Sequence, residues 1–137
     1  MKKKVLFICT HNSARSQMAE GLLNHLCGSK YEAYSTGTEP SIVNPYAIRV
    51  LAEIDIDISG NRSKGIEEFQ TMKFDYVVTV CDNAKETCPF FPRGKKYIHK
   101  SFDDPSGVEG EDSDNKLAIF KKVRNEIMDW VKETFEL

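Results

Sequence analysis

Short apolar runs alternate with longer amphipathic segments along this chain. The runs at 3–9 and 74–81 are rich in branched and aromatic residues, as expected of strands buried on both faces. The segment 31–36 alternates between polar and apolar positions, and 96–102 is a fourth strand-like stretch. These four segments predict the strands of one sheet.

Helical periodicity occupies the stretches between and after these strands. Apolar side chains recur every three or four positions in 13–26 and in 113–136. Asn44–Pro45 is a typical start for a helix that extends to about residue 54, and 64–71 predicts a shorter helical piece. Strands that alternate with helices pair in parallel through right-handed crossovers. The pattern thus predicts one α/β domain over residues 1–137, with a four-stranded parallel sheet flanked by helices.

Charge and hydropathy narrow the classes of function. The formal net charge of −2 gives no electrostatic case for binding nucleic acid or an anionic membrane. Lysines at 2–4 precede only five apolar residues, too few for a secretory signal, and no stretch approaches the ~18 apolar residues of a membrane span. We expect a cytoplasmic protein without a cofactor, and a monomer.

The four cysteines are Cys9, Cys27, Cys81 and Cys88. In a reducing cytoplasm two structural disulfides are disfavoured, and a redox or metal role gains weight. The Cys81–Cys88 spacing lacks the short C-x2–4-C pattern of structural zinc sites, so we expect no metal there. Cys27 follows the apolar stripe of the first helix, and we interpret it as a structural thiol.

Reactive side chains follow three of the predicted strands. Cys9 ends the first strand, Cys81 ends the third, and Asp103 and Asp104 come directly after the fourth. Ligands of parallel α/β sheets bind beyond the carboxyl ends of the strands. We therefore expect these groups to meet at one edge of the sheet.

The segment CTHNSARS (9–16) predicts an oxyanion-binding loop. It leads into a helix N-terminus, where backbone N–H groups and the helix dipole favour an anion. The planar fork of Arg15 suits two oxygens of a phosphate-like group, and these groups together stabilise a Cys9 thiolate. Ser16 can donate a hydrogen bond to that sulfur, and Asn12 tolerates a left-handed backbone conformation. The loop residues expected to bind or support the anion are Thr10, His11, Asn12, Ser13, Ala14 and Ser16. The alternative is a buried strand-end cysteine with an ordinary surface arginine nearby.

Five segments carry a family resemblance over essentially the whole chain: CTHNSARSQMAEGLL, STGTEP, NPYAIRVLAEIDIDIS, DYVVTVCDNAKETCP and FDDP. They resemble the low-molecular-weight protein tyrosine phosphatases and the thioredoxin-coupled arsenate reductases of the same superfamily. The later segments resemble the reductase branch more closely. The resemblance implies the phosphatase-like, Rossmann-like three-layer fold.

The resemblance also implies a relay of three thiols. Cys9 would attack arsenate held by Arg15, with Asp104, or its neighbour Asp103, as the acid. Cys81 would then attack the Cys9 sulfur and expel arsenite, and Cys88 would attack Cys81. Thioredoxin or a similar dithiol protein would reduce the resulting Cys81–Cys88 disulfide.

The spacing of the last two cysteines adds a conformational requirement. On a continuous helix their Cα atoms would lie ~10.5 Å apart, whereas a disulfide tolerates at most ~7 Å. The segment between Cys81 and Cys88 must therefore unwind or loop out, so we expect oxidation to be coupled to a conformational change.

Some reductases of this kind bind potassium behind the loop. Asn12, Glu20 and Ser35 match part of that site. However, Arg62 and Lys64 stand near the positions where relatives supply an oxygen and a carboxylate, and either cation could replace the metal.

Other departures bear on the substrate. His11 and Ala14 replace a glycine and a cysteine that many relatives carry in the loop, and neither replacement removes a reacting group. Ser106 stands where phosphatases usually place an aromatic residue, which weakens the case for phosphotyrosine.

Three functions remain as hypotheses at this point. The first is arsenate reduction, with phosphate or sulfate as competing oxyanions. The second is a phosphatase acting on phosphotyrosine or small phosphomonoesters, for which Cys81 and Cys88 would not be needed. The third is a sensor that binds arsenite through three thiols, which would call for a DNA-reading or partner-binding element.

Overall fold

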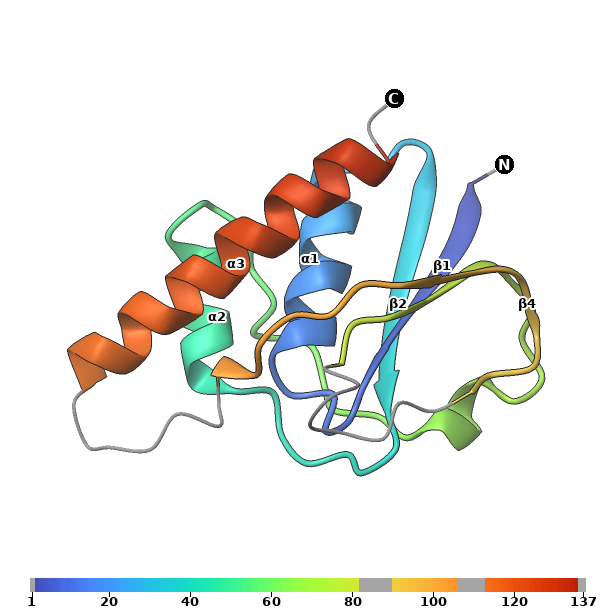
Figure 1. Ribbon diagram of the computed structural model, residues 1–137, viewed down its shortest axis with the longest axis horizontal. Coiled ribbons are helices and arrows are strands. Elements are labelled where there is room, and N and C mark those ends of the chain that lie inside the picture. Colours follow the sequence, from blue (N-terminus) through green and yellow to red (C-terminus); the bar gives the residue numbers. More distant parts are fainter. Residues whose placement is uncertain (1, 82–89, 106–112, 136–137) are drawn as a thin grey trace.

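The computed structural model describes residues 2–81, 90–105 and 113–135 (Figure 1). Four strands form one parallel sheet in the order β2-β1-β3-β4, as the alternation of strands and helices predicts. The strands are β1 (Lys3–Cys9), β2 (Tyr31–Gly37), β3 (Phe74–Thr79) and β4 (Gly94–His99). The helices are α1 (Arg15–Cys27), α2 (Pro45–Ala52), the 3-10 helix η1 (Ile66–Phe69) and α3 (Ser113–Phe135).

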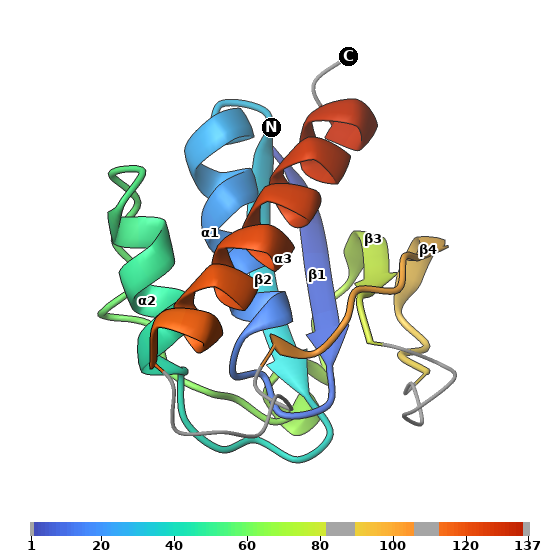
Figure 2. The same ribbon diagram turned by 60° about the vertical axis from the view of Figure 1, so that its left-hand side comes forward.

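The central strand β1 is buried on both faces, which explains its uninterrupted apolar run. Val5 and Phe7 belong to a large core that includes the apolar sides of α1, α2 and α3. Leu6 and Ile8 belong to a second, smaller core with Phe69 of η1. Each such side chain contributes roughly 1.5–3 kcal/mol when it is fully buried. Figure 2 shows the three α-helices gathered on one side of the sheet.

The helix α2 begins where the sequence predicts. The Asn44 side-chain oxygen accepts a hydrogen bond of 2.8 Å from the backbone N–H of Tyr46, and Pro45 occupies the first helical position.

Among the helices of the described residues, none has the length and the apolar character that a membrane span needs.

Several element boundaries differ from the sequence-based expectation: α1 begins at Arg15 rather than at residue 13, and α2 ends at Ala52 rather than near residue 54. The helical piece predicted over 64–71 is a single 3-10 turn. The strand β3 stops at Thr79, although the N–H of Val80 still donates to Ile8 O at 2.9 Å. The strand β4 begins at Gly94 and ends at His99, because its backbone pairs with β3 over a polar stretch that apolar periodicity does not mark.

The register aligns the carboxyl ends of the two central strands. Ile8 of β1 pairs with Thr79 of β3 and, on its other side, with Thr36 of β2. Cys9 and Cys81 therefore leave adjacent strands at the same edge of the sheet, where neighbouring strands lie about 4.8 Å apart.

Candidate active site

The loop between β1 and α1 turns its carbonyl groups outward. The carbonyl of Thr10 accepts the N–H of Glu39 at 2.8 Å, and that of Ser13 accepts the N–H of Asn44 at 2.9 Å. The intervening carbonyls of residues 11 and 12 also accept hydrogen bonds from outside the loop. In a planar trans peptide the N–H points opposite to the C=O. The N–H groups of residues 11–14 thus face the inner side of the loop, as an oxyanion site requires.

Close packing of β2 against the loop requires a glycine. A Cβ atom built on Gly37 would lie 2.6 Å from Thr10 O and 2.7 Å from Asn12 N. The glycine of the STGTEP segment therefore lets the end of β2 support the loop backbone directly.

Cys9 lies at the base of the loop in contact with a serine hydroxyl. Its side chain is buried, and its Sγ lies 2.9 Å from Ser16 Oγ. The Asn12 side-chain amide donates to the same Ser16 oxygen at 2.8 Å. Because Ser16 Oγ accepts from Asn12, its own hydrogen can be donated to a Cys9 thiolate. This chain of contacts matches the arrangement that the sequence suggests.

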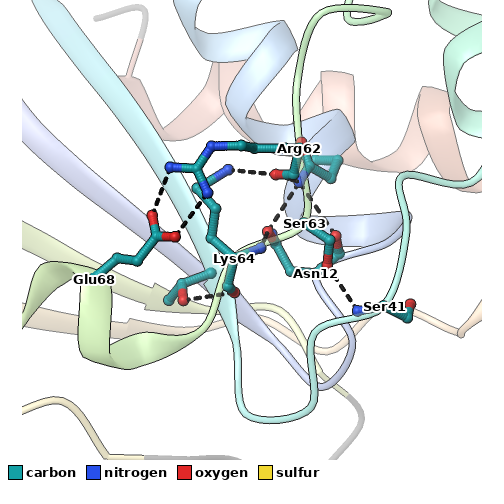
Figure 3. Close-up of polar contacts among 8 residues, drawn as sticks. Asn12, Ser41, Arg62, Ser63, Lys64 and Glu68 are labelled. Carbon is teal, nitrogen blue, oxygen red and sulfur yellow. Dashed lines mark hydrogen bonds and ion pairs between the residues drawn. The ribbon is translucent and has the colours of Figure 1, made fainter.

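The orientation of Asn12 is set by contacts from two other segments. Its side-chain oxygen accepts a hydrogen bond of 2.9 Å from the backbone N–H of Lys64 (Figure 3). The same oxygen accepts a second hydrogen bond, also of 2.9 Å, from Gln17 Nε2. The Asn12 backbone has φ of 49°, the left-handed conformation expected for this asparagine. The Gln17 side chain is fully buried and also donates to Arg62 O at 3.0 Å. Gln17 therefore supports the loop from behind, a role that the sequence analysis missed.

Arg15 and Asp104 complete the loop's rim. The Arg15 side chain is only 2% exposed, and one of its terminal nitrogens donates to Phe102 O at 3.3 Å. The other lies 3.7 Å from a carboxylate oxygen of Asp104, in an ion pair. Asp104 is half-buried and lines one small pocket together with Cys9 and Arg15, whereas Asp103 is exposed. Of the two candidate acids, the structure brings Asp104 to the nucleophile.

Three more of the predicted loop residues lie around the same pocket, whereas Thr10 is not among its lining residues. His11, Ser13 and Ala14 line it with the residues above. The His11 ring is half-exposed, with its Nδ1 3.1 Å from Glu39 O, so the imidazole is turned toward the 37–44 segment.

The cysteines differ in oxidation state. Cys9 and Cys27 are thiols, and Cys81, which is fully buried, is in a disulfide. Cys27 ends α1, thirteen residues from the loop, inside the main apolar core. Cys88 and Ser106, and the predicted conformational change in the 82–88 segment, fall outside the described residues.

The residues behind the loop do not fit the potassium site of some relatives. Both lone pairs of the Asn12 side-chain oxygen already accept hydrogen bonds, and the Lys64 Nζ donates to Arg62 O at 2.8 Å. Ser35 Oγ is buried next to Glu20 but makes no hydrogen bond of ordinary geometry within the described residues. A metal ion here would be repelled by the ammonium of Lys64.

Lys64, rather than Arg62, supplies the positive charge behind the loop. Arg62 turns away and binds Glu68 through two hydrogen bonds of 2.7 and 2.8 Å (Figure 3). Burial lowers the pKa of Lys64, and attraction to Glu20 partly offsets this effect. Burial likewise raises the pKa of Glu20, and Lys64 partly offsets that shift.

Replacing Ser16 with alanine is expected to slow alkylation of Cys9 by iodoacetamide at neutral pH about 10- to 100-fold. A hydrogen bond to a charged group contributes roughly 1.5–3 kcal/mol, and the Ser16→Ala variant loses the one made to the attacking sulfur. The matched control is Ser41→Ala, because Ser41 contacts the loop system through its backbone N–H. Equal alkylation rates in all three proteins would contradict this role.

The site combines a cysteine at the end of a strand, a loop around it that leads into a helix, and a buried arginine. These features define a class of α/β proteins that bind an oxyanion and attack it with a cysteine sulfur. The family model described as low molecular weight phosphotyrosine protein phosphatase matches residues 4–136. The chain belongs to this family.

Several proteins that are similar to this chain are arsenate reductases. The arsenate reductase of Halalkalibacterium halodurans is 45% identical over 126 residues, which cover 92% of this chain and 90% of that protein. A solved arsenate reductase in its phosphate-binding state has a TM-score of 0.81 and 35% identity, covering 97% of this chain and 95% of that one. The thioredoxin-dependent arsenate reductase of Corynebacterium glutamicum has a TM-score of 0.68 and 32% identity, covering 96% of this chain and 61% of that one.

Proposed function

We propose that the protein reduces arsenate to arsenite through Cys9, Cys81 and Cys88, with a thioredoxin-like dithiol protein as the electron donor. The observation that carries the proposal is a thiol in the oxyanion loop beside a second cysteine that is in a disulfide. A phosphatase needs one thiolate, because water completes its reaction. A reductase must collect two electrons from further thiols. The arsenate reductases similar to this chain over nearly its whole length support the same choice.

The first step is nucleophilic attack. The Cys9 thiolate attacks the arsenic atom of arsenate, whose oxygens are held by inward N–H groups of the loop and by Arg15. Asp104 protonates the leaving oxygen, which departs as water and leaves a sulfur–arsenic bond. The Arg15–Asp104 contact of 3.7 Å keeps the acid at the loop before the substrate binds.

The second and third steps move the electrons. Cys81 attacks the Cys9 sulfur, the sulfur–arsenic electron pair passes to arsenic, and arsenite leaves. Cys88 then attacks Cys81 and releases the Cys9 thiolate. At the end of this relay Cys9 is again a thiol and Cys81 is in a disulfide. The structure has Cys9 and Cys81 in these same forms. Phosphate and sulfate, which share the tetrahedral shape, act as competing ligands.

The alternative function is hydrolysis of phosphotyrosine or small phosphomonoesters. It is favoured by the family match and by the same loop, which would hold a phosphoryl group equally well. It assigns no role to the disulfide of Cys81. We also propose that the protein is a monomer and that it acts in the cytoplasm. The reducing conditions of that compartment would keep its thiols reduced.

The decisive experiment measures arsenate-dependent NADPH oxidation in the presence of thioredoxin and thioredoxin reductase. Continuous oxidation that requires both arsenate and the protein is the expected result. If arsenate drives no oxidation while an aryl phosphate is hydrolysed, the reductase proposal is wrong and the phosphatase alternative holds.

Arg15→Lys is expected to lower kcat/KM for arsenate about 100- to 1,000-fold, the usual loss when one oxyanion donor is removed. A lysine ammonium is a compact point charge and lacks the planar fork that binds two oxygens through parallel N–H groups. The matched control is Arg124→Lys, because Arg124 is also buried but binds Val50 O on α2 at 2.7 Å. A loss in Arg124→Lys as large as that in Arg15→Lys would assign the effect to stability.

A further inference from the structure

An exposed aromatic pair is formed by Tyr97 of the outermost strand β4 and by Phe90, which follows the Cys81–Cys88 segment in the chain. Phe90 and Tyr97 are 75% and 48% exposed, and their rings stack with centroids 5.4 Å apart and an interplanar angle of 25°. They border a cavity of about 390 Å³ whose lining also includes Val77, Phe91 and Ile98. Scattered exposed apolar residues need no explanation, but a paired aromatic patch beside an apolar hollow is typical of interaction sites.

The same patch lies on an unpaired strand edge. β4 is the last strand in the order β2-β1-β3-β4, so within the described residues its outer backbone edge faces no other strand. Exposed Lys95 and Lys96 on this strand disfavour pairing with a second copy of the chain, since like charges would meet. An edge of this kind can still bind the extended segment of a different protein.

Chain connectivity places the patch inside any interface made by an electron donor. Cys81 is fully buried, so a donor thiolate has to reach the disulfide at Cys88. Phe90 is two residues further along the chain, and two residues span at most about 7 Å. A standard protein interface covers about 800 Å² on each partner, which corresponds to a radius of roughly 16 Å. An interface centred on Cys88 therefore extends over Phe90.

We propose that Phe90, Tyr97 and the outer edge of β4 form the docking surface for the dithiol protein that reduces the Cys81–Cys88 disulfide. This inference rests on the proposed function. The partner is a thioredoxin-type protein with an apolar surface around its attacking cysteine, because an apolar patch is matched by apolar contact. Aromatic side chains at the centre of an interface commonly carry most of its binding energy.

The docked partner performs two thiol exchanges. Its first thiolate attacks the Cys88 sulfur, and Cys81 leaves as a thiolate, which gives a mixed disulfide between the two proteins. Its second thiol attacks its own sulfur in that bond and releases the Cys88 thiolate. The partner dithiol is thereby oxidised to a disulfide, and the two cysteines of this chain are reduced.

The test uses full-length protein that has been oxidised in advance and contains no arsenate. The rate constant for reduction by thioredoxin is measured by stopped-flow, alongside reduction by dithiothreitol. Phe90→Ser is expected to lower the thioredoxin rate constant at least 10-fold and leave the dithiothreitol rate unchanged. Tyr97→Ser should show the same pattern. The matched control, Ile42→Ser, removes a side chain that is 68% exposed in the segment that connects β2 to α2.

Three outcomes would overturn the docking surface. These are an unchanged thioredoxin rate in Phe90→Ser, an equal loss with thioredoxin and dithiothreitol, or a wild-type dimer that Phe90→Ser disrupts. Because the assay contains no arsenate, a failure of arsenate reduction would leave its result intact, and the two proposals fail separately.

Discussion

Cys9→Ser is expected to abolish both arsenate reduction and aryl phosphate hydrolysis, with residual activity at least 10,000-fold below wild type. A serine hydroxyl is not ionised at neutral pH, whereas the loop, Arg15 and Ser16 are arranged to stabilise a negative sulfur. The substitution is almost isosteric, so the fold should remain intact, which thermal unfolding can verify. The measurement compares steady-state rates for arsenate and for p-nitrophenyl phosphate.

The control for Cys9→Ser is Cys27→Ser, which also replaces a buried thiol. Cys27 is 6% exposed and Cys9 is 2% exposed, but Cys27 lies at the far end of α1. It should keep at least half of the wild-type rate with both substrates. Comparable losses in the two variants would show that the Cys9 effect reflects packing and would remove Cys9 from the mechanism.

Cys88→Ser is expected to limit arsenate reduction to at most one turnover per protein molecule. Without this thiol, Cys81 can still attack the Cys9 sulfur, but the Cys9–Cys81 disulfide that forms is not resolved. Arsenite released in a single burst, measured against protein concentration, checks the stoichiometry. Hydrolysis of p-nitrophenyl phosphate by the reduced variant should equal that of wild type, because hydrolysis uses Cys9 alone.

The burst amplitude decides between the two functional classes. A Cys88→Ser variant that sustains thioredoxin-driven turnover would contradict the three-thiol relay. A non-reducing mass measurement after the burst should find one intramolecular disulfide that contains Cys9. Cys27→Ser again serves as the control, since it should turn over continuously.

Apolar periodicity predicted most of this fold, because the burial of β1 and of the apolar faces of the helices is visible in the order of apolar residues within each segment. The run at 3–9 is a strand throughout, the run at 74–81 is a strand as far as Thr79, and the segment starting at Pro45 is a helix. The edge strand β4 begins two residues before the predicted strand, because Gly94 and the exposed Lys95 leave no apolar signal. Boundaries fail where the backbone, and not the side chains, makes the contacts.

The residues that face the anion were predictable from the sequence, whereas the residues that hold the loop from behind were not. One short segment contains Cys9, Arg15 and Ser16, and these residue types are typical of an anion-binding loop. Gln17 and Lys64 act through contacts from beyond the loop, the latter 52 residues away from Asn12. A glutamine on a helix has no local pattern that distinguishes a buried loop support from an exposed polar residue.

The lysine behind the loop has a consequence for the conditions in which the protein can work. A bound metal ion is lost when its concentration falls, but the Lys64 ammonium is tethered to the chain and cannot be diluted. The backbone N–H of the same residue holds Asn12, so the charge and the loop's shape come from one covalent unit. We therefore expect the loop to keep its shape when potassium is exchanged for sodium inside a cell during osmotic stress. The protein would then keep its capacity to process a toxic oxyanion while the ionic composition around it shifts.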